Sequence, residues 1–571
     1  MLKNLLLLLT IFTCTSLSAQ TWDGGGDGTS WDDATNWSTD TIPEVGATAI
    51  FPDGISANVT GSAPNAIRRI IFDTLSTVTL DLDLDFEITG NPVHAINLQK
   101  DANVTFGGTS DMRTFNIVPG IGRNAFNLIG EGITVTVTEQ ASLSISNICQ
   151  NAIRINKADG LFVNNGTINL VDYVEHGINL LKGTFTNNGT IDIGAGTVDG
   201  DPTSDGIRIA NDGVFDNNAN GVITITQALD DGLEVLGVFS NAGTISTVAH
   251  DDGLANNGGL VVGSANSAGV MNNLAGGTIN ADGGIGGTSR AFSIQGSGTL
   301  NNAGAINISG GNMGQALQNL GTLTNEICAR INLTESRVLN SNAGMLTNNG
   351  LITSSWTGSG VNNAAADGSV LNNAFYGYTN TNADFAGGNE ESTDNGQNSS
   401  DGIVVDAANT CTVADIGIDV PYTWYTDASG TVEAGTNDAN GLLNFNDDIF
   451  AESGTQTLYT CFGEEVQLIV QNVSGDCALI NTGVDFIPLT DVFTMMPNPA
   501  QAYTQIEFGH EYIAEDKTIE VYDVVGQLVH TATLSGVDNY ILHIDNFTPG
   551  IYTVNLQTEK GMQIERLIVQ E

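Results

Sequence analysis

The chain has 571 residues, of which 16 are Lys or Arg and 64 are Asp or Glu, so its formal net charge is −48. Such an acidic protein does not bind nucleic acid, because affinity for the phosphate backbone comes from Lys and Arg that displace its counterions. The 69 glycines, the 14% of charged residues and the lack of a sustained helical period exclude a helical enzyme and favour stacked strands and turns.

The first 19 residues are typical of a cleaved secretory signal peptide. Lys3 precedes an apolar run from Leu5 to Phe12, and small residues lead to Ala19, after which we expect cleavage. The run is too short to cross a bilayer as a permanent anchor, and no later segment is long and apolar enough to do so. We therefore predict a protein that is exported through the periplasm and is secreted or held at the outer cell surface.

Residues 20–60 contain TWDGGGDGTSWDDATNW at positions 21–37, which holds three of the five tryptophans of the chain. We predict that Trp22, Trp31 and Trp37 cap the repeat that follows, because an uncovered terminal coil would expose a sheet edge. Two other interpretations stay open: exposed tryptophans would make a sugar-binding platform, and four carboxylates would hold calcium. Those four carboxylates belong to Asp23, Asp27, Asp32 and Asp33.

Residues 61–375 contain a repeat of about 20 to 30 residues. In each repeat an apolar residue is followed two positions later by Asn, as in Phe185 and Asn187. Alternate residues of a strand share a face, so each Asn points inward and needs a hydrogen-bond partner. The nearest partner is the Asn one coil away, which predicts a ladder of stacked amides. The ladder comprises Asn164, Asn187, Asn217, Asn241, Asn272, Asn302, Asn325, Asn348 and Asn372.

Self-similarity of this length without helices predicts a β-solenoid, in which a coil buries its apolar face only by stacking on its neighbours. The repeat resembles the right-handed parallel β-helices of the pectate-lyase type, which carry an asparagine ladder. That family has coils of this length, and the repeats of this chain predict about twelve of them. The predicted fold class is all-β: the parallel β-helix, then an immunoglobulin-like β-sandwich, then a small C-terminal β-sandwich.

A second pattern, a polar residue followed by Gly or Ala and an apolar residue, recurs once per coil and predicts a polar stripe. The stripe comprises His94, Asn124, Asn151, His176, Asp205, Asp231, Asp252, Arg290 and Gln315. Carboxylates on adjacent coils would lie about 5 Å apart, a separation that suits an acid–base pair. TSDG and LDDG resemble two motifs of polygalacturonase-like hydrolases, although HDDG stands where that family has HG and no RIK follows. This resemblance implies five catalytic candidates: His176, Asp205, Asp230, Asp231 and Asp252.

The same stripe has a structural interpretation, because a polar residue before Gly is what a tight turn needs. The turns are short, and few Lys or Arg are present to neutralise a uronate substrate. We therefore favour a non-catalytic surface protein, adhesive or glycan-contacting, over a polysaccharide hydrolase or lyase that uses the stripe from His176 to Asp252. Calcium is the cofactor that the carboxylates would take. Its ligands would come from Asp205, Asp230, Asp231, Asp251 and Asp252.

The composition changes after residue 375. Residues 376–402 read as an acidic linker, and residues 403–490 read as short strands between turns. Cys411, Trp424 and Cys461 resemble the core of an immunoglobulin-like sandwich, which implies a Cys411–Cys461 disulfide, with Cys461–Cys477 as the alternative. Cys149 and Cys328 lie too many coils apart to bridge each other, so we expect both to be buried free thiols.

Residues 491–571 contain MMPNPAQAYTQIEF, IEVYDVVGQLVHTATL, PGIYTVNL and the ending RLIVQE. These segments resemble the C-terminal sorting domain of Bacteroidota type IX secretion substrates. The resemblance implies that the type IX machinery is a partner and that it carries the protein across the outer membrane. Physically the segment reads as a small antiparallel sandwich with a turn at Pro549 and Gly550.

Overall fold

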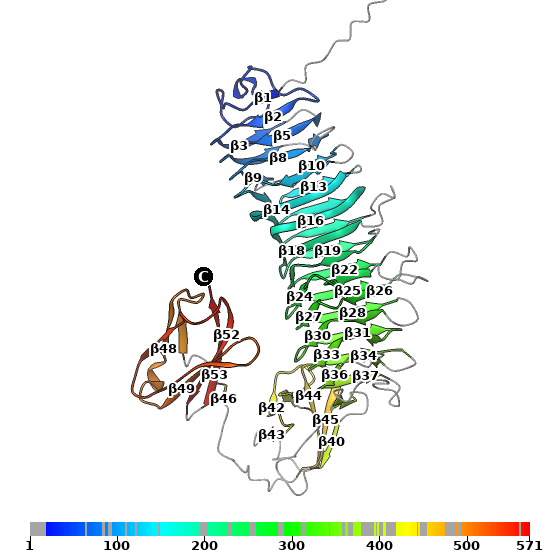
Figure 1. The fold of residues 1–571 in the computed structure, drawn as a ribbon, viewed down its shortest axis with the longest axis vertical. Coiled ribbons are helices and arrows are strands. Elements are labelled where there is room, and N and C mark those ends of the chain that lie inside the picture. Colours follow the sequence, from blue (N-terminus) through cyan, green and yellow to red (C-terminus); the bar gives the residue numbers. More distant parts are fainter. Residues whose placement is uncertain are drawn as a thin grey trace, which may run out of the picture. The chain divides into compact units, whose positions relative to one another are not determined.

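The structure is a computed structural model, and it describes residues 19–570 with internal gaps. The gaps are 63–65, 83–85, 90–93, 109–110, 120–122, 147–148, 195–203, 227, 229, 250–257, 284–289, 311–315, 342, 357–359, 364–368, 379–392, 395–396, 399–402, 407–417, 419, 442, 446–453, 474–486, 489–492 and 559–560. Residues 1–18, which form the predicted signal peptide together with Ala19, lie outside the described residues. The chain divides into two compact units, Met1–Gly475 and Asp476–Glu571 (Figure 1).

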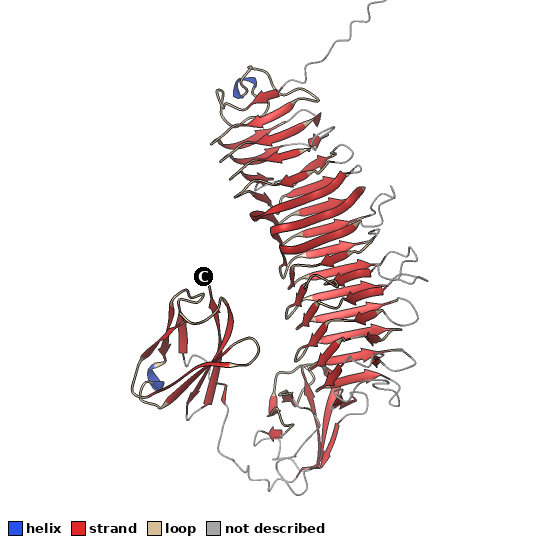
Figure 2. Cartoon of the chain, viewed as in Figure 1, coloured by secondary structure: helices blue, strands red, loops and turns tan. Residues whose placement is uncertain are grey.

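The first unit contains a β-solenoid of about 12 turns, and Figure 2 shows that it consists of strands joined by loops, with almost no helix. Each coil contributes strands to three parallel faces, here called faces one, two and three. Each strand pairs in parallel with the strand one coil away; for example, Phe185 of one coil aligns with Phe215 of the next. The predicted all-β solenoid is confirmed. None of the helices among the described residues is long and apolar enough to cross a membrane.

Face one carries the strands that begin each coil. They are β1 (Ala19–Thr21), β2 (Thr48–Phe51), β5 (Arg69–Phe72), β8 (Ile96–Leu98), β11 (Phe126–Leu128), β14 (Cys149–Asn164), β16 (Tyr173–Asn187), β18 (Asp205–Asn217), β20 (Leu233–Val235), β23 (Gly258–Val262), β26 (Arg290–Ile294), β29 (Leu317–Asn319), β32 (Val338–Asn340) and β35 (Val361–Asn363). The three long strands β14, β16 and β18 continue around the corner into face two, which joins both faces into one sheet.

Face two ends at the asparagine ladder. Besides the second halves of β14, β16 and β18, it comprises β3 (Ser56–Gly61), β6 (Thr77–Leu82), β9 (Asn103–Phe106), β12 (Thr134–Val137), β21 (Val238–Asn241), β24 (Val270–Asn273), β27 (Thr299–Asn302), β30 (Thr322–Asn325), β33 (Met345–Asn348), β36 (Ser369–Asn372) and β38 (Thr393–Asp394).

Face three is a 14-stranded sheet. Its strands are β4 (Ala66–Ile67), β7 (Phe86–Ile88), β10 (Arg113–Ile117), β13 (Ala141–Ile145), β15 (Thr167–Leu170), β17 (Thr190–Ile193), β19 (Val222–Ile225), β22 (Thr244–Val248), β25 (Thr278–Asp282), β28 (Ala305–Ser309), β31 (Arg330–Thr334), β34 (Leu351–Ser354), β37 (Phe375–Tyr378) and β39 (Gln397–Asn398). Because β1, β2 and β3 already join the sheets and β38 and β39 continue them, the solenoid extends into both the predicted cap and the predicted linker.

The interior is filled by columns of like residues, one per coil. Phe162, Phe185, Phe215 and Phe239 stack, with ring centroids 4.9, 4.7 and 5.2 Å apart along the column. All four rings are fully buried. Stacking of the coils therefore buries apolar surface that no single coil could bury alone.

The asparagine ladder runs beside this column. From Asn164 to Asn372, each side-chain amide donates to the amide oxygen one coil on, with N···O distances of 2.7–2.8 Å. One predicted member is wrong: Asn273 occupies the rung assigned to Asn272. Met271 aligns with the buried Phe239, so Asn272 faces outward, where it accepts a hydrogen bond from Asn301. A one-residue slip in a strand exchanges the two faces.

The N-terminal segment closes the first coil as predicted. Trp22, Trp31 and Trp37 are buried, pack edge to face, and lie against Phe51 of β2. The short 3-10 helix η1 (Ala34–Asn36) lies between the last two tryptophans. Because all three indoles are covered, they form no exposed sugar platform.

The aspartates of this segment bind its own backbone. Asp27 accepts hydrogen bonds from the N–H groups of Thr29 and Ser30 and from the Asn36 amide, and Asp33 accepts one from Thr35 N–H. The Ser30 hydroxyl and these donors hold the pKa of Asp27 below its usual range. The carboxylates therefore shape the loop, which accounts for their spacing without an ion.

Residues 403–473 form a six-stranded sheet that packs on the last coils. Its strands, in spatial order, are β40 (Ile403–Asp406), β45 (Gly463–Val473), β44 (Gly454–Thr460), β41 (Thr423–Tyr425), β42 (Glu433–Asn437) and β43 (Leu443–Phe445). β40 pairs with β45 in parallel, and the other strand pairs are antiparallel. Phe375 of the solenoid contacts the rings of Tyr422, Trp424 and Phe462 from this sheet. We call the sheet the C-terminal cap.

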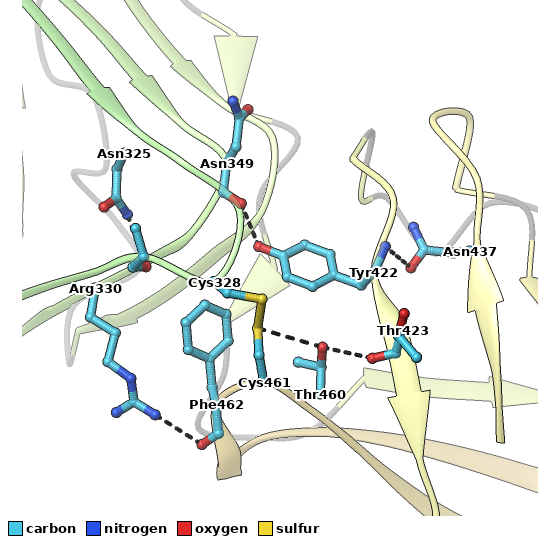
Figure 3. Close-up of a disulfide and its surroundings, with 11 residues drawn as sticks. Asn325, Cys328, Arg330, Asn349, Tyr422, Thr423, Asn437, Thr460, Cys461 and Phe462 are labelled. Carbon is cyan, nitrogen blue, oxygen red and sulfur yellow. Dashed lines mark hydrogen bonds between the residues drawn. A yellow bond between two sulfur atoms is a disulfide. The ribbon is translucent and has the colours of Figure 1, made fainter. Parts of the chain in front are cut away.

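A disulfide between Cys328 and Cys461 fastens the cap to the solenoid, with the Cα atoms 5.7 Å apart (Figure 3). The predicted Cys411–Cys461 bridge, its Cys461–Cys477 alternative and the predicted free thiol at Cys328 are therefore wrong. The guanidinium of Arg330 lies 5.3 Å from the Phe462 ring centroid and donates to the Phe462 carbonyl, and the Tyr422 hydroxyl donates to the Asn349 carbonyl. Cys411 and Cys477 lie outside the described residues.

The second unit is a small two-sheet sandwich with its own core. One sheet comprises β46 (Ile487–Pro488), β53 (Gly561–Val569), β52 (Gly550–Thr558), β49 (Lys517–Tyr522) and β50 (Leu528–Leu534), in that spatial order. The other comprises β47 (Phe493–Met496), β48 (Tyr503–Phe508) and β51 (Asn539–His543), with the 3-10 helix η5 (His510–Tyr512) after β48. Tyr552, Val554 and Leu556 point into the core as expected from their alternation.

Candidate functional site

The polar stripe lies at the start of the face-one strands, and it binds one coil to the next. The backbone N–H of Asn124 donates to His94 Nδ1 at 3.0 Å, and that of Asn151 donates to Asn124 Oδ1 at 3.1 Å. Farther along, the N–H of Asp231 donates to Asp205 Oδ1 at 3.3 Å. Stripe side chains therefore satisfy backbone donors that the turn would leave unpaired.

After Asp231 the stripe continues at Gly258. Leu233 of β20 aligns with Leu260 of β23, so Gly258 takes the coil position that sequence spacing assigned to Asp252. The N–H of Gly258 donates to Asp231 Oδ1 at 2.8 Å. Asp251 and Asp252 lie outside the described residues, as does Gln315, whereas Arg290 aligns with Gly258 on the next coil.

Three of the predicted acidic residues come together at the centre of the stripe. Asp205, Asp230 and Asp231 place one carboxylate oxygen each within 4.8 Å of the others. Asp205 is only 3% exposed and Asp231 only 8%. His176 joins the group through Nδ1, which lies 3.1 Å from Asp205 Oδ2.

This crowding favours neutral carboxyl groups. Burial, followed by the negative charges of Glu234 and Asp230, raises the pKa of Asp205 well above its usual range. Burial and the neighbouring charge of Asp205 likewise raise the pKa of Asp231. Proximity of like charges and loss of water both disfavour ionisation. A protonated Asp205 can donate its hydroxyl proton to His176 Nδ1.

The described cluster does not offer enough free oxygen for a calcium ion. Calcium takes roughly six to eight oxygen ligands, and the three carboxylates present here carry six oxygens between them. One oxygen of Asp205 accepts a backbone N–H and the other lies against His176, and one oxygen of Asp231 accepts the N–H of Gly258. The chemistry of the donor set therefore fits a hydrogen-bonded acid pair better than a metal site.

Replacing Asp205 by Asn tests this description. Since the folded-state pKa of Asp205 is raised, its contribution to stability is fully present below about pH 4 and is lost as the pH rises through the folded pKa. Asn keeps an acceptor for Asp231 N–H and a donor for His176 without the charge. We expect Asp205→Asn to stabilise the protein by about 1–3 kcal/mol at pH 8 and to have little effect at pH 4.

Urea unfolding at both pH values, with and without calcium, measures this difference. The variant Asp212→Asn is the matched control, because Asp212 lies exposed on the same strand and pairs with Lys182 at the surface. A calcium-dependent loss of stability in Asp205→Asn would contradict the acid-pair description and indicate a bound ion.

A second row of polar side chains lies beside the stripe on the outer surface of face one. Asn127, Arg154, Asn179, Arg208 and Glu234 align with one another on successive coils. Arg208 Nε donates to Glu234 Oε2 at 2.7 Å, and Asn179 Nδ2 donates to Asn151 Oδ1 at 3.0 Å. The buried Asn179 Oδ1 accepts no hydrogen bond from any described residue.

Sequence analysis missed this row, although its signal is present. The fourth residue of HGINL, DGIRI and DGLEV is Asn179, Arg208 and Glu234, respectively. Each lies between two apolar residues that point inward, so its own side chain must face outward. Amide, guanidinium and carboxylate groups at one-coil spacing provide both donors and acceptors for hydroxyl groups. Arg154, Arg208 and Glu234 of this row are partly exposed, whereas Asn127 and Asn179 are only 5% exposed, so a glycan chain on face one would meet the three charged side chains first.

Comparison with known proteins identifies the second unit. Residues 494–570 match the family described as the secretion system C-terminal sorting domain. This match indicates a secreted or cell-surface protein that the type IX secretion machinery handles.

The other comparisons add little. The comparison with curated proteins found no match. Among solved structures, the crystal structure of dimeric latent PorU from Porphyromonas gingivalis is similar at 15% identity over 26% of this chain and 16% of that chain, with a TM-score of 0.13. A likeness at that score says nothing about function.

Proposed function

We propose that this protein is a non-catalytic β-helix protein of the cell surface or the medium that contacts glycans through face one, as an adhesin does. One observation carries the proposal: the carboxylates of the stripe are buried and accept backbone N–H groups from the next coil. A catalytic acid or base must reach the glycosidic bond, so groups committed in this way support a structural role.

Glycan contact is supported by the outward row. The partly exposed Arg208 and Glu234 stand one coil apart, at about 4.8 Å spacing, and Arg154 stands two coils before Arg208 on the same parallel sheet. Such fixed side chains lose little conformational freedom when they bind a ligand. A neutral polysaccharide is the favoured ligand, because a net charge of −48 repels a polyanion.

One observation favours the alternative, a polysaccharide hydrolase or lyase that uses His176, Asp205 and Asp231. Two adjacent carboxylic acids with raised pKa values are a common property of catalytic sites. Their oxygens lie within 4.8 Å, near the separation of about 5 Å that retaining glycosidases use.

Incubating the purified full chain with neutral and acidic polysaccharides, with and without calcium, separates the two functions. We expect binding to neutral polysaccharides in a pull-down assay and no release of reducing ends or unsaturated products. Arg154→Ala should weaken binding about tenfold or more, whereas Asn218→Ala, at an exposed Asn just after the face-two strand β18, should not. Product release that Asp231→Asn abolishes would establish the enzyme instead.

A further inference from the structure

The sorting domain presents an apolar hairpin tip to solvent. Asp523–Gln527 joins β49 to β50, and it places Val524 and Val525 at the turn. Their exposed fractions are 78% and 80%, the highest among the large apolar residues that the structure describes. Six other valines and isoleucines of this domain, among them Val521 and Val554, pack into its core, and those that are exposed are less exposed than the tip. Apolar side chains kept this open in a folded domain indicate a contact surface.

The tip is held in one conformation by its own hydrogen bonds. Asp523 Oδ1 accepts from the N–H groups of Val525 and Gln527 at 3.0 and 2.9 Å, and the Asp523 carbonyl accepts from Gly526 N–H at 3.0 Å. Gly526 has a φ of 77°, which other residues adopt only with strain. A preorganised tip loses little entropy when a partner covers it.

The strand that leaves the tip has an unpaired edge. β50 is the last strand of its sheet, so within the described part of the chain only β49 pairs with it. Its sequence LVHTATL contains none of the Lys, Glu or Pro residues that protect such edges in other proteins. Leu528 and Val529, 45% and 39% exposed, continue the apolar surface from the tip. Val524, Val525, Leu528, Val529 and the free edge of β50 together make the tip–edge surface.

We propose that the tip–edge surface is where the type IX secretion machinery docks, by adding a β-strand to the free edge of β50 and seating Val524 and Val525 in an apolar recess. Strand addition recognises an edge through main-chain hydrogen bonds, and pockets for side chains supply the specificity. The match of residues 494–570 to a sorting domain favours the machinery as the occupant, because this domain is what the machinery handles. Docking of this kind presupposes the export route of the proposed function.

Export of the full-length chain from a bacterium that has the type IX machinery tests the docking surface. Two double variants alter it: Val524→Ser with Val525→Ser removes the apolar tip, and Thr531→Lys with Thr533→Lys puts charge on the edge strand. We expect each to lower the surface and medium fraction by about tenfold or more and to accumulate in the periplasm.

Matched controls carry the same chemical changes elsewhere on the domain. Ile541→Ser removes an exposed apolar side chain from β51, and Thr553→Lys adds charge to β52, which is paired on both sides. Both should be exported like the wild type. Thermal unfolding of each purified variant must match the wild type, so that retention reports docking and not misfolding.

Export of both double variants at the wild-type level would overturn the proposal. A wild-type dimer in solution that the double variants dissociate would also overturn it, because the occupant would then be a second copy of the chain. If deletion of residues 494–571 blocks export while the double variants pass, only the docking surface is wrong. If the wild-type chain itself is retained in the periplasm, both the proposed export route and the proposed docking surface are wrong.

Discussion

Asn217→Ala is expected to destabilise the solenoid by about 2–4 kcal/mol, because the substitution breaks the asparagine ladder in its middle. Asn217 accepts from Asn187 and donates to Asn241, both at 2.8 Å, and all three side chains are buried. Without Asn217, the amide oxygen of Asn241 loses its ladder donor where water cannot replace it. Urea unfolding measures the loss, and hydrogen exchange should localise it to β16, β18 and β21, since each coil contacts only its neighbours.

The neighbouring residue supplies the control. Asn218 is exposed, and its amide donates to Asn188 in an outer row that water can reach. We expect Asn218→Ala to change stability by less than about 0.5 kcal/mol. Equal effects of the two substitutions would show that the ladder adds no more than a surface hydrogen bond.

Removing the disulfide is expected to cost about 4–5 kcal/mol, because Cys328 and Cys461 close a loop of 133 residues and so restrict the unfolded chain. In Cys461→Ser the C-terminal cap keeps only noncovalent contacts with the solenoid, such as those of Phe375 with Tyr422 and Phe462. The cap should therefore open more readily than in the wild type. Digestion by a protease should then release fragments of residues 403–473 well before the solenoid is cut.

A mutant cycle distinguishes the bond from the individual side chains. Cys328→Ser, Cys461→Ser and the double variant should lose the same stability, since each lacks the same bond. Reductant should reproduce the loss in the wild type and change nothing in Cys461→Ser. Additive losses in the double variant would mean that the two cysteines are not bonded to each other.

The fold could be predicted wherever the sequence repeats. A rung of the ladder and the apolar residue two positions before it recur once per coil, and because a coil contacts only its neighbours, one spacing describes most contacts of the solenoid. The covered tryptophans follow from the same logic, since a terminal coil needs a lid. The sorting domain was recognisable because its strands and turns lie together in one short segment.

The register of individual strands was harder to predict, because a shift of one residue exchanges the inward and outward side chains. Val270 and Met271 are both apolar, and either could face inward; alignment with Phe239 selects Met271 and therefore Asn273. In the same way Gly258 takes the place of Asp252 after a longer connection. Because the loops between coils vary in length, the repeat spacing does not show which residue of the next strand points inward, although the presence of a repeat is clear from the sequence.

Adjacent acidic motifs in the sequence by themselves determined that Asp205 and Asp231 lie one coil apart. Only the tertiary structure decided that both carboxylates are buried and bound to the backbone of the next coil, because burial depends on how coils stack. The partner of Cys461 was decided in the same way. Cys328 lies near it only because the cap packs on the last coils through Phe375, and contacts between segments 133 residues apart leave no local pattern in a sequence.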